Sequence, residues 1–154
     1  SLGCAVAYLA DHPDRQQALR DDPSLISAAI EELLRWETPV PGVVRVATQD
    51  VDVAGSTIPA GSTVTCLLAS ANTDGAEFAD PESVDFARAA NRHLAFGAGV
   101  HRCLGSHLAR LEMRVALEEL HARIPQYAVK TGETPTYTMG IRGVEYLPLV
   151  WQSA

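Results

Sequence analysis

The longest helix that the sequence predicts, over residues 105–124, has apolar side chains on two opposite faces. At about 100° per residue, one face collects Leu104, Leu108, Leu111 and Val115. The opposite face collects Met113, Leu117, Leu120 and Ile124. A helix that is apolar on both sides is packed between two layers. Since the chain has little material left to cover both faces, we expect the helix to require further protein, either more chain or a second copy.

Composition indicates one globular domain of 154 residues, 47% hydrophobic and 20% charged. The net charge of −7 argues against nucleic acid or an anionic membrane as the main partner, and no apolar run is long enough to span a bilayer. The first residues, SLGCAVAYLADHPD, lack the basic region of a signal peptide. The cysteines Cys4, Cys66 and Cys103 are widely spaced, which predicts no disulfide framework and fits a reducing cytoplasm.

Three helices are predicted before Pro39, over residues 1–10, 13–20 and 23–36. A residue that precedes proline is pushed out of the helical region, so the first helix closes before Pro13. Asp22 and Pro23 open the third helix, as its N-cap and its first helical residue.

Residues 43–70 change to β-branched alternation, interrupted by turn residues at Gln49-Asp50, at Gly55 and at residues 59–61. This pattern predicts a small antiparallel meander. Residues 71–95 have little periodicity and predict a long ordered loop, which is usually functional. Candidate C-terminal strands lie at residues 127–129, 136–138 and 144–150. The predicted fold class is therefore mainly α with small antiparallel β sheets (α+β).

The decapeptide FGAGVHRCLG, residues 96–105 and called the cysteine loop below, places a lone thiol directly before the long helix. Free amides and the helix dipole at a helix N-terminus stabilise an anion, which favours the thiolate of Cys103. Three glycines allow tight turns and close approach to a flat ligand: Gly97, Gly99 and Gly105. The other side chains supply a ring and two cations or hydrogen-bond donors: Phe96, His101 and Arg102.

Other interpretations of the cysteine loop exist. A phosphate-binding loop would need a third glycine at the required spacing and a Gly-Lys-Ser/Thr motif. A zinc site from His101, Cys103 and His107 would lack a CxxC pair. A nucleophilic cysteine, with either histidine as its base, would match no nucleophile signature. A buried structural cysteine is the default for a lone thiol, but it does not explain the whole decapeptide.

The cysteine loop resembles the haem-binding loop of cytochrome P450 enzymes, which has the pattern F-G-x-G-x-H-x-C-x-G in bacterial members. The match extends to Ala109, which completes the form C-x-G-x-x-x-A. The resemblance implies haem b (iron protoporphyrin IX) as the cofactor and Cys103 as the axial thiolate ligand of its iron, a ligand that favours O–O cleavage. It also implies that Phe96 packs near the haem and that His101 hydrogen-bonds a propionate.

A second motif, the E-x-x-R of EELLRW, agrees with this resemblance. Glu32 and Arg35 are i, i+3 neighbours on the predicted helix, and VDFARAANRHLAFG places Arg88 at the position of the family's third partner. On its own the pair would be a solvated surface ion pair. The resemblance implies instead a buried network that holds the fold and the haem loop, since burying such charges is costly unless every donor is satisfied.

Two further segments resemble parts of the same family. VVRVATQDVDVAGSTIPAGSTV resembles its small sheet, in which Arg45 would contact a haem propionate; an exposed strand arginine is the alternative. GIRGVEYLPLVW resembles the C-terminal hairpin of bacterial members. Residues near both segments would then line an apolar substrate pocket, namely Pro41, Val43, Val44 and Ile141. His93 and His107 are interpreted as structural.

The resemblance covers residues 1–154 but corresponds only to the C-terminal haem-binding portion of a cytochrome P450 domain, without its distal N-terminal portion. For the whole protein it implies a monooxygenase that hydroxylates an apolar small molecule with O₂. Electrons would come from a ferredoxin-type partner on a basic face formed by Arg102, Arg110 and Arg114. The alternatives are a truncated, non-catalytic relative that binds haem or a partner protein, and a zinc-binding module.

Overall fold

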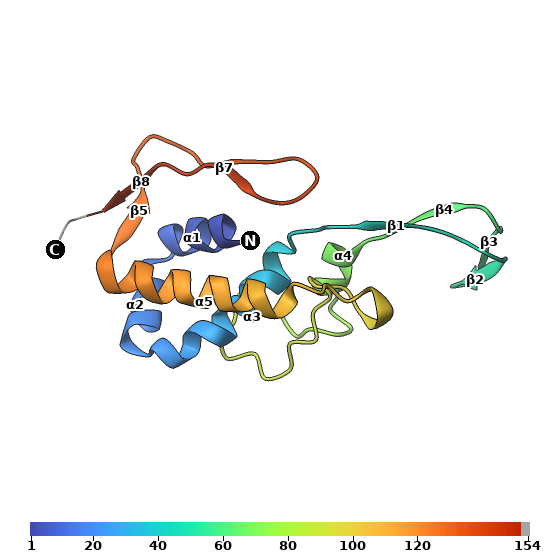
Figure 1. Cartoon of the computed structure of the whole chain (residues 1–154), viewed down its shortest axis with the longest axis horizontal. Helices are drawn as coiled ribbons and strands as arrows, with labels where there is room; N and C mark the ends of the chain where they lie inside the picture. Colours follow the sequence, from blue (N-terminus) through green and yellow to red (C-terminus); the bar gives the residue numbers. More distant parts are fainter. Residues whose placement is uncertain (152–154) are drawn as a thin grey trace.

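The computed structural model describes residues 1–151, in which a body of helices carries β ribbons that extend from it (Figure 1). Helix α5 runs through this body and packs against α3, while α1 packs against α2 and α3. The core between these helices is apolar and nearly free of solvent, and its fully buried members include Leu9, Ile30, Leu33 and Leu117. Together with the small antiparallel sheets, this arrangement confirms the predicted α+β class.

Four helical segments open the chain: α1 (Leu2–Asp11), α2 (Pro13–Asp21), a 3-10 turn η1 (Pro23–Leu25) and α3 (Ile26–Glu37). The predicted helices at 1–10 and 13–20 are confirmed, and the third differs at its start. Asp22 caps the 3-10 turn, because its carboxylate accepts a hydrogen bond of 3.0 Å from the Ser24 amide. The α-helical geometry begins only at Ile26, which lets the buried face of α3 turn toward the core.

Helix α5 (Ser106–Arg123) carries the two predicted apolar faces. Its inner face packs on α3, where Leu117 is 0% exposed and Met113 is also buried. Its outer face is open, with Leu108 58% exposed and Leu111 47% exposed. Within residues 1–151, one layer therefore covers α5, and no second layer covers the outer face. No helix in this part of the chain is both long and apolar enough to cross a membrane.

The segment after α3 forms two separate antiparallel pairs, so the prediction of a meander was wrong. The strands are β1 (Val43–Val46), β2 (Val51–Val53), β3 (Ser56–Ile58) and β4 (Thr63–Cys66). β1 pairs with β4, and β2 pairs with β3. A tight turn at Ala54 and Gly55, both with positive φ (49° and 81°), returns β2 onto β3. The Gly61 amide donates a hydrogen bond of 2.8 Å to the Ala47 carbonyl, and this bond continues the β1–β4 ladder.

Helix α4 (Leu68–Asn72) directly follows β4, where the alternating pattern had predicted the end of the β region. The run from Leu67 to Ala71 contains mainly leucine, alanine and serine, and its apolar residues do not alternate. Residues 73–98 then form a long loop without helix or strand, in agreement with the prediction for 71–95. A 3-10 turn, η2 (Gly99–His101), ends this loop shortly before α5.

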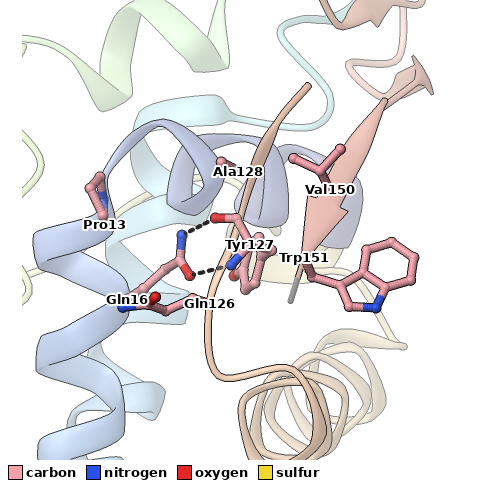
Figure 2. Close-up of a pocket in the computed structure, with 7 residues that line it drawn as sticks. All are labelled: Pro13, Gln16, Gln126, Tyr127, Ala128, Val150 and Trp151. Carbon is pink, nitrogen blue, oxygen red and sulfur yellow. Dashed lines mark hydrogen bonds between the residues drawn. The ribbon is translucent and has the colours of Figure 1, made fainter. Parts of the chain in front are cut away.

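Two further strand pairs close the described chain, namely β5 (Tyr127–Val129) with β8 (Leu149–Trp151) and β6 (Thr136–Tyr137) with β7 (Val144–Tyr146). The buried Gln16 of α2 joins the first pair to the helices (Figure 2). Its Nε2 donates to the carbonyls of Leu9 at 2.7 Å and Tyr127 at 2.8 Å, and its Oε1 accepts the Tyr127 amide at 3.3 Å. One amide side chain therefore fixes where β5 lies against α1 and α2.

Candidate functional site

A cavity of about 430 Å³ opens beside the cysteine loop, and Cys103 lies in its wall. Ser1 and three longer segments line the cavity: residues 39–45 after α3, the end of β4 with the start of α4, and residues 94–103. Its apolar lining includes Pro39, Val40, Val43, Leu68, Leu94 and Phe96. An apolar cavity with few polar groups is the usual form of a ligand site.

The polar groups of this cavity include two thiols, those of Cys103 and Cys66, and two basic side chains. Cys103 is a free, exposed cysteine, so its sulfur is accessible to a ligand. Arg45 and His101 are also exposed and line the same cavity. The Arg45 side chain contacts protein only through Nη1, which donates 2.8 Å to the Val44 carbonyl. A guanidinium placed in this way suits a carboxylate on a bound ligand.

Backbone hydrogen bonds hold the cysteine loop in a tight turn. The Cys103 amide donates a hydrogen bond of 2.8 Å to the Phe96 carbonyl, and the Gly97 amide donates one of 2.8 Å to the Leu94 carbonyl. Gly97 has a positive φ of 66°, and a Cβ placed there would come within 3.2 Å of the His101 carbonyl oxygen. Glycine is therefore required at this position, and the loop directs Cys103 toward the cavity.

The structure brings some of the predicted site residues together and separates others. Those that line the cavity are Arg45, Phe96, Gly97, His101, Cys103 and Val43. Those that do not are Val44, Gly99, Gly105, Ala109 and Ile141. Successive side chains of a strand point to opposite faces, so Val44 faces away while its neighbours on β1 face inward. Ile141 is 70% exposed and lies outside this lining, so neither Ile141 nor Val44 lines this cavity, and their assignment to a substrate pocket stays a prediction.

Sequence reasoning missed Cys66 as a cavity residue. Cys66 is directly opposite Val43 in the β1–β4 register, so both side chains line the cavity. The signal was present in the alternation of residues 63–66, but the expected meander paired these strands differently. A second thiol therefore shares the cavity with Cys103.

Glu32, Arg35 and Arg88 form one ion-pair network behind the cysteine loop. Arg35 donates to both carboxylate oxygens of Glu32 at 2.8 Å, and Nε of Arg88 lies 3.1 Å from each of them. Glu32 and Arg35 are both 0% exposed. Burial would raise the pKa of Glu32, but hydrogen bonds from Arg35, the Asp85 amide and Arg88 outweigh it and lower the pKa. The carboxylate is therefore charged and fully paired.

The remaining donors of Arg35 hold the long loop in place. Its Nη1 donates hydrogen bonds of 2.8 Å to the carbonyls of Asn72 and Pro81, and its Nη2 donates one of 2.9 Å to the carbonyl of Ser83. The side chain of Asn72, which is also 0% exposed, accepts the Leu94 amide at 2.6 Å. Sequence reasoning missed Asn72, for which no motif gave a signal. The network therefore extends to Leu94, two residues before the cysteine loop.

The predicted basic face is reduced by internal ion pairs. Nε and Nη2 of Arg110 donate to the carboxylate of Glu31, at 2.6 and 2.8 Å, and Nη1 of Arg114 lies 3.7 Å from Glu118. Only Arg102, of the three predicted arginines, has no carboxylate partner among residues 1–151. His107 is exposed at this face, and its interpretation as structural stays a prediction.

The residues around Cys103 fit a haem better than a metal ion bound by protein alone. Among the described residues, no group of three or more His, Cys, Asp and Glu side chains could hold a metal ion, so the zinc interpretation gains no support. The Cys103 thiol, an apolar wall and two basic side chains provide one metal ligand and partners for two carboxylates, and the second thiol of the cavity is that of Cys66 on β4. This donor set matches an iron porphyrin that carries its own equatorial nitrogens.

A second cavity, of about 370 Å³, lies between α2 and the β5–β8 pair (Figure 2). It is lined by Pro13, Gln16, Gln126, Tyr127, Ala128, Val150 and Trp151, none of which carries a thiol, an imidazole or a charge. The polar atoms of Gln16 point to the backbone of Tyr127 instead of the cavity. This second cavity therefore offers no group comparable to the Cys103 thiol.

A family model described as cytochrome P450 matches residues 1–123, which include the network, the cavity lining and the cysteine loop. The chain belongs to the cytochrome P450 family. It is similar to cytochrome P450-SU2 of Streptomyces griseolus, at 47% identity over 147 residues, covering 93% of this chain and 36% of that protein. It is also similar to the vitamin D3 dihydroxylase of Streptomyces griseolus, at 43% identity, covering 96% of this chain and 37% of that protein.

Solved cytochrome P450 structures share this fold. The crystal structure of P450BioI, in complex with an acyl carrier protein ligated with hexadec-9Z-enoic acid, superposes with a TM-score of 0.92 at 40% identity. The match covers 98% of this chain and 40% of that one. The chain therefore spans about two fifths of the length of these cytochrome P450 relatives.

Proposed function

We propose that Cys103 is the axial thiolate ligand of a haem b, and that the whole protein is a monooxygenase that hydroxylates an apolar small molecule. The observation that carries the proposal is the exposed Cys103 thiol in an apolar cavity that Arg45 and His101 also line. Family membership supports the cofactor, since thiolate-ligated haem is the form that favours O–O cleavage. When bound, the haem supplies the oxygen chemistry.

The protein's own residues bind and orient this group. Cys103 gives up its proton and provides the sulfur ligand, while the hydrogen bond from its amide to Phe96 fixes the loop. Arg45 and His101 pair with the haem carboxylates by charge-assisted hydrogen bonds. Phe96 packs beside the macrocycle, and Gly97 leaves room for the turn. The buried Glu32 network keeps the preceding loop in position, and so acts on the fold instead of the reaction.

The substrate class, the electron donor and the cellular location are inferred from the cavity, the surface and the cysteines. Apolar residues dominate the lining, which supports an apolar substrate. Arg102 is exposed beside the loop and supports docking of an acidic electron donor such as a ferredoxin. All three cysteines are free, which supports a reducing cytoplasm as the location.

The test compares the two thiols that share the cavity, in the whole haem-loaded protein. Cys103→Ser removes the proposed ligand, and Cys66→Ser makes the same substitution on β4. We expect the reduced, carbon monoxide-bound protein to show a thiolate-type Soret band in the wild type and in Cys66→Ser, and to lose it in Cys103→Ser. A thiolate-type band that persists in Cys103→Ser would overturn the assignment.

A further inference from the structure

A second ion-pair cluster lies between the cysteine loop and helices α3 and α5. It consists of Glu31, His93 and Arg110, called the Glu31 cluster here. Nε and Nη2 of Arg110 donate to the two carboxylate oxygens of Glu31 at 2.6 and 2.8 Å, and Nε2 of His93 lies 3.1 Å from the same carboxylate. The His93 side chain is only 3% exposed, and those of Glu31 and Arg110 are half-buried. The cluster is therefore part of the packed structure.

The charges in this cluster are fixed by its contacts. Burial would raise the pKa of Glu31, but the hydrogen bonds from His93 and Arg110 lower it to about 2. The Ala95 amide donates 3.1 Å to Nδ1 of His93, so the ring carries its proton on Nε2, which faces Glu31. His93 thereby connects the carboxylate to the backbone just before Phe96.

Arg110 contacts both ends of the cysteine loop. Its guanidinium carbon lies 4.5 Å from the centre of the Phe96 ring, a cation–π contact at the start of the loop. Its Nη1 donates 3.2 Å to the Ser106 carbonyl, just past the end of the loop. The Phe96 carbonyl in turn accepts the Cys103 amide, and the Cys103 carbonyl accepts the Ser106 amide at 3.2 Å. The planar guanidinium is held in place by its bidentate pairing with Glu31.

We propose that Glu31, His93 and Arg110 are positioning residues for Cys103: they hold the Phe96 ring and the loop ends, and so set how the sulfur is presented to the haem. The proposal rests on the proposed function for its effect on the haem. Its structural part concerns the chain alone. None of the three residues lines the cavity, so they act through Phe96 and the backbone.

The test uses Arg110→Gln in the whole protein, with Arg114→Gln as its matched control. The control removes the same charge one turn further along α5, where the contact with Glu118 is long and exposed. In the haem-free protein, we expect hydrogen exchange of the Cys103 amide to become about tenfold faster in Arg110→Gln, the effect of losing one partly buried cation–π contact and its ion pair. The control should change the rate less than about twofold.

Two further variants make the result decisive. Arg110→Lys keeps the charge but not the planar group, so it should also accelerate exchange, and it carries the test if Arg110→Gln does not fold. In Phe96→Leu, adding Arg110→Gln should have a smaller effect than in the wild type, because the two act as one unit. Unchanged exchange in both Arg110 variants, or fully additive effects with Phe96→Leu, would overturn the proposal.

The haem-loaded protein separates this proposal from the proposed function. If both hold, the ferric/ferrous midpoint potential moves in Arg110→Gln and not in Arg114→Gln, while both variants keep the thiolate-type Soret band. A midpoint potential that is the same in both variants and the wild type counts against the positioning role. A wild-type spectrum without thiolate character counts against Cys103 as ligand, and leaves the exchange measurement to decide on the Glu31 cluster.

Discussion

Nε of Arg88 lies 3.1 Å from each carboxylate oxygen of Glu32, although the two residues are 56 positions apart in the chain. This contact ties α3 to the loop that leads into the cysteine loop. Arg88 also donates 2.7 Å to the carbonyl of Ala79, so the loop is held at several points. The position of Cys103 therefore depends on charges that lie outside the cavity.

Replacing Glu32 is expected to lower the free energy of unfolding substantially. Glu32→Gln leaves Arg35 buried without its counter-charge, and removing one partner of a buried pair costs about 3–5 kcal/mol of the free energy of unfolding. Glu77→Gln is the control, since Glu77 pairs with Arg92 at the exposed surface, at 3.0 Å, and should cost less than about 1 kcal/mol. Urea unfolding of the haem-free whole protein measures both. An equal decrease in the free energy of unfolding for the two variants would contradict the claim that the Glu32 network stabilises the fold.

Local patterns were enough to predict α1, α2, α5 and most of α3, because each carries its own signals, but they did not predict the short helix α4. Asp22 and Pro23 mark a start, and α5 has a clear apolar period. The pairing of β1 with β4 was not predictable from alternation, because the choice of partner depends on the turn at Ala54 and Gly55 and on backbone bonds beyond it. Cys66 was missed for the same reason.

Replacing Asn72 tests a residue that no motif indicated. Asn72→Ala removes the acceptor of the Leu94 amide and the donor to Thr38 Oγ1, which it contacts at 2.8 Å, and leaves both groups buried. We expect a loss of about 2–4 kcal/mol in the free energy of unfolding. Thr73→Ala, next to it, removes only local hydrogen bonds to the carbonyls of Ala69 and Ser70 and should cost less than about 1 kcal/mol. A loss for Asn72→Ala as small as that of Thr73→Ala would show that Leu94 is held by other contacts.

The pKa of Glu31 predicts a dependence of stability on pH. Its pKa is about 2 in the fold against 4.5 as the ordinary value, so between these values the unfolded chain binds a proton that the folded chain does not. The stabilisation by Glu31 is therefore complete above pH ~5 and is lost as pH falls toward 2. Near pH 6, the free energy of unfolding of the wild type should exceed that of Glu31→Gln by on the order of 2 kcal/mol, allowing for partial exposure. This difference should vanish near pH 2.

Unfolding curves of the two proteins at several pH values, fitted for the free energy of unfolding, measure this difference. Glu118→Gln serves as the exposed control on α5, and its difference from wild type should stay below about 1 kcal/mol. A difference for Glu31→Gln that does not change with pH would contradict a charged, paired carboxylate at this position.

The residues of the candidate site that belong to local motifs were predictable from the sequence, whereas those whose position depends on tertiary packing were not. The cysteine loop, Arg45 and Arg88 are short-range motifs, and the structure places each beside its expected partners or cavity. Whether Val44 and Ile141 line this cavity was not predictable, because it depends on strand orientation and on the position of the β6–β7 turn; both lie outside its lining. Arg110 could not be separated from the free arginines by sequence alone, since its pairing with Glu31 requires α3 and α5 to pack together.

The central claim is that one sulfur, that of Cys103, coordinates the haem iron. X-ray absorption at the iron edge tests it most directly in the whole haem-loaded protein, because this method detects the sulfur ligand itself. The account predicts one sulfur ligand in the wild type and in Cys66→Ser, and none in Cys103→Ser. A wild-type iron without a sulfur ligand, or a sulfur ligand that persists in Cys103→Ser, would contradict it.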